Sequence, residues 1–160
     1  MIQAIQESSI TAYINTEANR INTSVGSDKI RHLMKFTNDL DGSIQYAYST
    51  THFISERYTK MTFDYNATPD VYTGKLDLNP AGYYKYEAYE VSWTGAVTVS
   101  SGNAPANEDD VLSPAAATKG VVQGLVAIGK MYVAEKSGSE QVQYTQHPEP
   151  SGTNYIYYGQ

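Results

Sequence analysis

The sequence predicts an all-β protein, an antiparallel β-sandwich of Ig-like or jelly-roll-like type with an extended N-terminal arm. Apolar and polar residues alternate in about eight to ten short segments, which turn residues separate at the spacing expected of a sandwich or barrel. The chain has 160 residues, with 15 Tyr, 3 Phe and 1 Trp. Because Tyr joins an apolar ring to a polar tip, this bias favours strands and interfaces.

The N-terminal segment, residues 1–28, differs from the rest in being rich in Gln, Ser, Thr and Asn. Apolar alternation is weak in "IQAIQ" and "ITAYI", so this segment is interpreted as an arm that orders against neighbours, as one or two extra strands, or as a short helix. Gly26 and Asp28 mark a break in the chain. We therefore expect the sandwich domain to span residues 29–160.

A β pattern begins at residue 30. The Asp-Gly signal in "NDLDGS" predicts a turn over 38–43, so the segments on either side should form a hairpin. Gly74 should disturb one of the later strands. The strands expected in this half of the chain are 30–36, 44–50, 57–66, 71–78 and 83–93.

The segment "AGYYKYEAYEVSW" has aromatic residues on both faces of the strand that it predicts. Two interpretations stay open. The strand crosses from one packing environment to another, or it places one face in a core and presents Tyr84 and Tyr86 outward. The first face carries Tyr83, Lys85, Glu87, Tyr89, Val91 and Trp93, and the second carries Tyr84, Tyr86, Ala88, Glu90 and Ser92.

The last third of the chain is less regular. Gly124 and Gly129 argue against a helix in the apolar segment "VVQGLVAIGKMYV", which is expected to form two strands or one bent strand. The prolines of "HPEPSG" exclude that segment from a sheet. The remaining expectations are a loop over 100–110, one helical turn within 112–120, a turn over 135–140, and strands over 141–146 and 153–160.

Composition argues against several classes of function. The chain has 0 Cys, so neither a disulfide nor a thiolate zinc site can form. With a formal net charge of -6 and a pI of about 4.9, binding to nucleic acid is not expected. The N-terminus lacks the pattern of a signal peptide, and no segment is long and apolar enough for a membrane span. No cofactor and no membrane partner are expected.

Motifs that could carry chemistry all depart from the required pattern. "TNDLDG" has Thr37 and Tyr48 where a calcium loop needs acids, so a hairpin turn explains it better. His32, His52 and His147 lack the short spacing of metal ligands. Glu87 and Glu90 fall on opposite strand faces, which argues against paired-carboxylate chemistry. Glu108, Asp109 and Asp110 are interpreted as a solvated loop face.

Several segments together resemble small uncharacterised proteins encoded among the virion genes of marine and environmental tailed bacteriophages. The segments are "MKFTND", "ERYTKMTFDYN", "AGYYKYEAYEVSW", "GVVQGLVAIGKMYV", "QVQYTQHPEP" and "TNYIYYGQ". The resemblance covers most of the chain from about residue 33 onward and carries no site residues. It implies a non-enzymatic particle component, either an auxiliary or decoration capsid protein or a piece of the neck or tail. The protein would be made in the host cytoplasm and located in the virion.

The expected partners are other copies of the chain and other virion proteins, since extended termini can add strands to a neighbour's sheet. An alternative is a carbohydrate-binding β-sandwich module that uses exposed tyrosines, Tyr84 and Tyr86 among them. The candidate interface residues are Ile2, Ile5, Ile10, Tyr13, Tyr84, Tyr86, Tyr155, Tyr157 and Tyr158.

Overall fold

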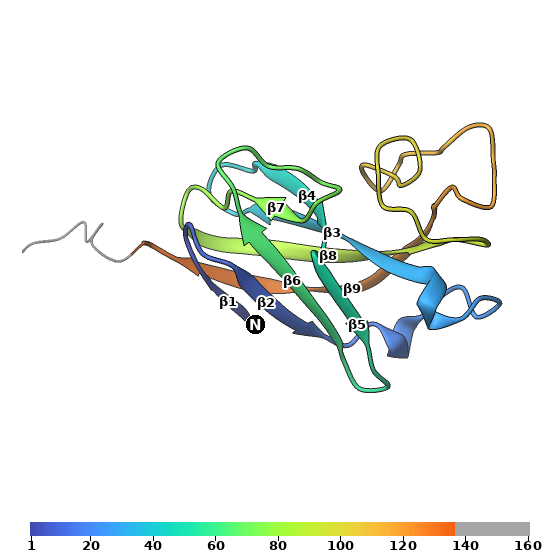
Figure 1. The fold of residues 1–160 in the computed structure, drawn as a ribbon. Coiled ribbons are helices and arrows are strands. Elements are labelled where there is room, and N and C mark those ends of the chain that lie inside the picture. Colours follow the sequence, from blue (N-terminus) through green and yellow to red (C-terminus); the bar gives the residue numbers. More distant parts are fainter. Residues whose placement is uncertain (137–160) are drawn as a thin grey trace, which may run out of the picture.

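The structure is a computed structural model, and it describes residues 1–136. Within that range the protein is all-β, with two sheets, one of which curls into a half-barrel (Figure 1). Sheet A has five strands in the order β1-β9-β8-β3-β4, and sheet B has the order β2-β6-β5, with β7 added beside β6. The strands are β1 (Ile2–Ile5), β2 (Ile10–Ile14), β3 (Ile30–Asn38), β4 (Ile44–Tyr48), β5 (Thr51–Ile54), β6 (Thr59–Tyr65), β7 (Lys75–Leu76), β8 (Gly82–Ser92) and β9 (Val121–Ala134).

The N-terminal residues belong to the two sheets of this chain, so the expected extended arm is not confirmed. β1 pairs in parallel with β9, and β2 pairs antiparallel with β6. Alternate residues of both strands are buried, which gives the weak apolar alternation of "IQAIQ" and "ITAYI" a structural role. Two short 3₁₀ helices, η1 (Glu17–Asn19) and η2 (Ser27–Lys29), lead from β2 to β3.

The predicted hairpin around the Asp-Gly turn is confirmed by antiparallel pairing of β3 with β4. Its turn places Gly42 at φ 73°, a backbone conformation that favours glycine. The strand expected over 71–78 is reduced to β7, Lys75–Leu76. Gly74 explains the difference, because it has φ 71° and lies so close to the backbone of Tyr48 and Thr50 that a Cβ would clash.

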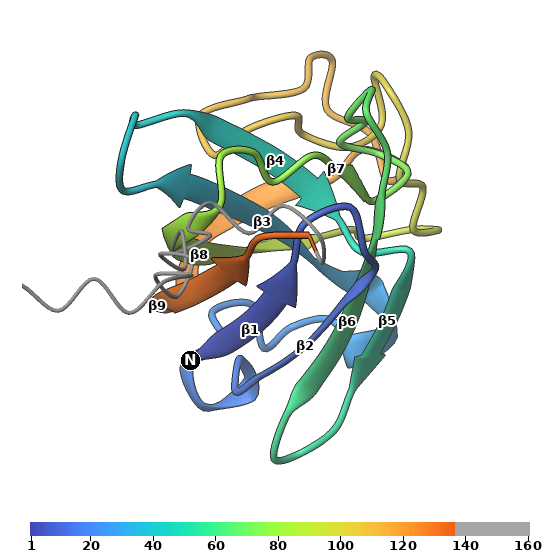
Figure 2. The same cartoon turned by 90° about the vertical axis from the view of Figure 1, so that its left-hand side faces the viewer.

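The main core lies between the two sheets (Figure 2), and both sheets supply its side chains. Phe36 from sheet A and Phe63 from sheet B meet edge to face, with ring centroids 5.6 Å apart. Met34, Met61 and Met131 are also fully buried there. Burial of this shared face holds the sheets together.

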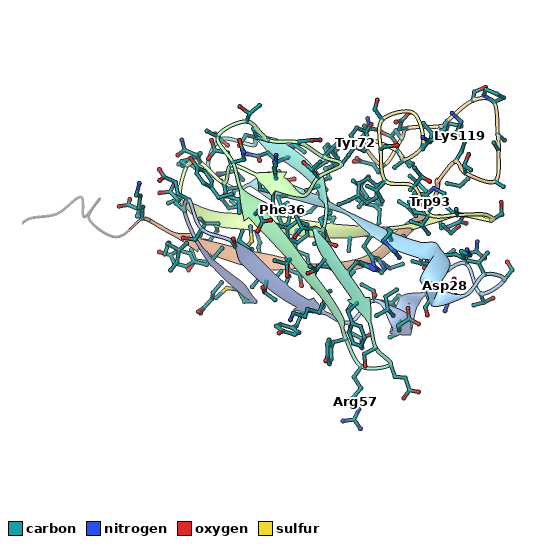
Figure 3. All side chains as sticks on the ribbon, in the orientation of Figure 1. Asp28, Phe36, Arg57, Tyr72, Trp93 and Lys119 are labelled. Atoms are coloured by element: carbon teal, nitrogen blue, oxygen red, sulfur yellow. The ribbon has the colours of Figure 1, made fainter. Side chains whose placement is uncertain are left out.

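A second, smaller core covers the other face of sheet A. It contains Leu33, Val91 and Trp93, together with Ala104 from the long connection between β8 and β9. Figure 3 shows Trp93 and Lys119 on the side of the molecule where this connection folds over the sheet. β8 therefore places Tyr84 and Ala88 in the first core and Val91 in the second, which confirms the interpretation of a strand between two packing environments.

The connection itself matches the loop expected over 100–110, and the helical turn expected within 112–120 is not formed. β9 is a single strand with two register shifts against β8, so the interpretation of one bent strand is correct. The turn expected at 135–140 extends beyond the described range, and the strands expected at 141–146 and 153–160 lie outside it.

Candidate functional site

Three exposed aromatic side chains form what we call the ring surface: Tyr13, Phe53 and Tyr58. Their exposed fractions are 61%, 58% and 39%. The Tyr13 and Tyr58 rings meet edge to face at a centroid distance of 5.5 Å, and Phe53 lies 6.4 Å from Tyr58. The ring surface is a continuous apolar area open to solvent.

Sheet B sets the position of these rings. In its register Tyr13 of β2 pairs with Lys60 of β6, and Lys60 pairs with Phe53 of β5, so the three residues form one row across the outer face. The Lys60 ammonium lies 5.9 Å from the Tyr13 ring centroid, within the range of a cation–π contact. Figure 3 shows Arg57 pointing away from the body at the tip of the β5–β6 turn.

A groove of about 430 Å³ adjoins the ring surface, and Tyr13 belongs to both. Asn15 and Asn19 line one wall, while Tyr86 and β9 line the other. The Asn19 side-chain amide donates a hydrogen bond to the Val126 carbonyl at 2.9 Å, so the chain around η1 is fastened to β9 at this point. Leu125 and Ile128, at the rim, are 44% and 59% exposed.

The backbone of β9 is open beside this groove. β1 pairs with Met131–Ala134 alone, and β8 covers the opposite side of β9 along its whole length. Within the described part of the chain, residues 125–130 therefore have no strand partner on the side away from β8. We call this stretch the open edge. An unpaired apolar edge is able to accept a strand from another chain.

The predicted interface residues separate into three groups. Ile2, Ile10 and Tyr84 are buried in the core of this chain. Tyr86 is half-buried and lines the groove, whereas Ile5 and Tyr13 are exposed. The remaining candidates, Tyr155, Tyr157 and Tyr158, lie outside the described residues.

The interpretation that presents Tyr84 outward is wrong. Its side chain is 2% exposed, and its hydroxyl donates a hydrogen bond to the Pro80 carbonyl at 2.7 Å. The even-numbered face of β8 packs toward sheet B, which explains the burial. Tyr84 is thus unable to stack on a sugar ring, and the carbohydrate alternative loses one of its two named residues.

Phe53, Tyr58, Leu125 and Ile128 were not identified from the sequence. Phe53 and Tyr58 lie on either side of the polar "SER" turn, and that spacing is the signal for an aromatic hairpin tip. Leu125 and Ile128 belong to an apolar run in which the pattern alone does not distinguish an edge from a core strand.

The two described histidines are brought together by the fold. His32 Nδ1 of β3 and His52 Nε2 of β5 lie 2.8 Å apart, so one ring donates a hydrogen bond to the other. Burial, followed by the nearby Arg31 charge, lowers the pKa of His32 to about 4. Burial also lowers the pKa of His52 to about 3, with smaller effects from His32 and Arg31. Both rings are neutral at pH 7, and the pair links sheet A to sheet B.

The acidic run on the long connection is not wholly a solvated face. The Glu108 side chain is 19% exposed and forms an ion pair with Lys35 of β3, while Asp109 remains exposed. This pair raises the pKa of Lys35, and burial beside Glu108 raises the pKa of Tyr46 to about 12. The contact fastens the connection to sheet A, which is a structural role.

In residues 1–136 no group of three or more His, Asp or Glu residues is arranged to hold a metal ion. Over the same residues, no helix has the length and apolar character needed to cross a membrane. No family model, no curated protein and no solved structure matches this chain.

Proposed function

We propose that this protein is a non-enzymatic structural component of a phage particle and acts through protein–protein interfaces. In the particle it serves as an auxiliary or decoration capsid protein or as a neck or tail component. The resemblance of its segments to proteins encoded among phage virion genes supports a role as a component of the particle. The exposed ring surface supports the proposal that the protein acts by binding other proteins.

The single observation that carries this proposal is the continuity of the ring surface with the groove and the open edge through Tyr13. Scattered exposed apolar residues are ordinary, whereas a contiguous patch on one side of a protein marks an interaction site. Aromatic side chains are enriched at the centres of such interfaces. Full burial of an exposed apolar side chain contributes about 1.5–3 kcal/mol, and each of these rings, which are 39–61% exposed, contributes a part of that when a partner covers it.

We further infer that the architecture is a β-sandwich of Ig-like or jelly-roll-like type. The shared core supports this inference, because side chains from two sheets interdigitate there, as in a sandwich. A rigid body of this kind suits a component that is repeated in an assembly, since binding then orders few additional residues.

The test measures the protein content of particles purified from cells infected with the phage that carries this gene. Mass spectrometry and densitometry should find the chain in several copies per particle, and gold-labelled antibodies against it should mark regular positions. Presence of the chain in the lysate together with its absence from washed particles would overturn the proposal. A lysate protein of similar abundance that is known to stay outside particles is the control for carry-over.

A further inference from the structure

We propose that the open edge of β9 accepts residues 153–160 of a second copy as an added β-strand, so that copies join head to tail. This inference rests on the proposed function and specifies one contact through which assembly takes place. It follows from the geometry of the edge, the groove beside it and the sequence of the C-terminal segment.

The backbone of the open edge has the right orientation for strand addition. The Gln6 amide donates a hydrogen bond to the Ala134 carbonyl at 2.9 Å, so the backbone groups of Ala134 point toward β1. Because these groups alternate along a strand, those of Lys130 and Ile128 point to the same side. β1 ends its pairing at Met131, and no other described strand continues it. A new strand would therefore extend the sheet in line with β1.

The groove provides room for the side chains of the added strand. β2 is an edge strand of sheet B, and Tyr13 and Ile14 at its end line the groove together with residues of β9. The Asn19 side chain donates a hydrogen bond to the Val126 carbonyl, so this carbonyl already has a partner at the η1 end of the groove. An added strand is thereby limited to the stretch between that contact and β1.

The open edge has little of the protection that natural edges carry against pairing. Proline, inward charges, lysines and β-bulges are the usual devices. A bulge interrupts the edge at Val126, and residues 127–130 continue it regularly up to the end of β1. Residues 125–130 contain one charged residue, Lys130, and its ammonium is paired with Asp39. The exposed side chains of Leu125 and Ile128 add apolar area to the rim. An edge with so little protection favours pairing with a strand that covers it.

The segment "TNYIYYGQ" has the chemistry of a partner strand. It contains no charged side chain and no proline, and its alternation places Tyr155 and Tyr157 on one face and Ile156 and Tyr158 on the other. The side chains of one face would enter the groove, and those of the other face would extend the exposed face of sheet A. Its neutrality avoids the repulsion that an acidic strand would meet in a chain of net charge -6.

A second copy is the source of this strand in our proposal. The C-terminal segment continues from the end of β9 at which β1 already fills the edge. To reach its own open edge it would have to reverse direction over β1, whereas a neighbour's segment enters without that reversal. Residues 137–152 span up to roughly 50 Å when extended, which is enough to bridge two molecules. A contact between unlike surfaces gives rings or filaments.

The experiment uses the full chain with single substitutions and measures association by analytical ultracentrifugation. Ile128→Pro removes the edge N–H, and Ile128→Lys is the second variant in case the proline variant fails to fold. Ile156→Asp places a charge in the donor strand. Each should weaken association by at least about tenfold. The matched control is Leu40→Lys, which alters a side chain 80% exposed in the β3–β4 turn and should leave association unchanged.

The decisive experiment mixes two of these variants. The Ile128→Lys chain keeps its donor strand, and the Ile156→Asp chain keeps its acceptor edge. Together they should form 1:1 dimers that grow no further. A mixed sample of ¹⁵N-labelled and unlabelled chains, with a photo-crosslinker at Tyr157, should give crosslinks to residues 125–130 between differently labelled chains.

Three results would overturn the inference: a wild-type chain that stays monomeric, crosslinks confined to single chains, and oligomers that persist in all edge and donor variants. In the last case the chain still assembles by another surface, and the proposed function stands. Absence of the chain from particles defeats the proposed function whatever the edge does, so the two failures are distinguishable.

Discussion

At the scale of single residues, Glu90 is the most deeply buried acid among the described residues. Its side chain is 1% exposed, and its two oxygens accept hydrogen bonds from the backbone amides of Ile21 and Asn22 at 2.9 and 2.8 Å. A buried carboxylate with one donor on each oxygen is well matched to two amides. This contact holds the segment between η1 and η2 against β8.

We expect Glu90→Gln to lower the free energy of unfolding. The glutamine amide nitrogen cannot accept a hydrogen bond, so one backbone amide loses its partner, at a cost of about 1.5–3 kcal/mol. Urea unfolding followed by fluorescence of Trp93, the single tryptophan, measures the change. Glu56→Gln is the control, because Glu56 is exposed in the β5–β6 turn and should change stability by less than about 0.5 kcal/mol. Equal effects of the two substitutions would show that the Glu90 contacts contribute nothing.

At the scale of elements, the close approach of β9 to the Tyr86 ring depends on Gly129. A Cβ at Gly129 would lie 2.5 Å from the Tyr86 hydroxyl oxygen and 2.6 Å from the ring carbon that bears it. The Tyr86 ring therefore lies against β9 at Gly129, where the strand has no side chain, and it also forms part of the groove wall.

Gly129→Ala should destabilise the protein by about 1–3 kcal/mol, because the ring or the strand must move to relieve the clash. Tyr86→Leu removes the ring atoms that the new methyl group meets. In the double variant the two losses should sum to more than the observed loss, with a coupling of about 0.5 kcal/mol or more. Strict additivity in urea unfolding would mean that the two residues do not meet.

The sequence pattern predicted strands that bury apolar side chains along their length. β3, β6 and β8 fall within two residues of their expected positions. β5 was missed because Thr51 and Phe53 are exposed and His52 and Ile54 are half-buried, so it has no clear apolar face. The parallel pairing of β1 with β9 was not predictable, because it joins the two ends of the described fold by a contact that no local pattern encodes.

The same physics limited prediction of the candidate site. Alternation identifies the two faces of a strand but does not reveal which face a second sheet covers. Tyr84 and Tyr13 both lie in strands that contribute to the core between the sheets, and the fold buries the first and exposes the second. Tyr13 is one of the predicted interface candidates and is exposed, whereas Phe53 is placed in the same row as Tyr13 by the register of sheet B, which the sequence pattern does not reveal.

At the scale of the whole molecule, the His32–His52 pair makes the packing of sheet A on sheet B sensitive to acid. In the folded protein both rings stay neutral down to pKa values of about 4 and about 3. In the unfolded chain histidine has its ordinary pKa of about 6.5. The unfolded state therefore binds more protons below pH 6.5, and acid favours unfolding.

The free energy of unfolding should be insensitive to this pair above about pH 7 and should fall as the pH is lowered from about 6.5 toward 4. The slope approaches about 1.4 kcal/mol per pH unit for the buried His32, and His52, which is partly exposed, adds less. His52→Gln keeps an amide nitrogen near the position of Nε2 and removes one titrating ring, so its slope should be shallower than that of the wild type. Urea unfolding at half-unit pH steps measures both slopes. Identical slopes in the two proteins would show that His52 contributes nothing to the acid sensitivity, and would leave it to His32 and to carboxylates, whose protonation also begins near pH 5.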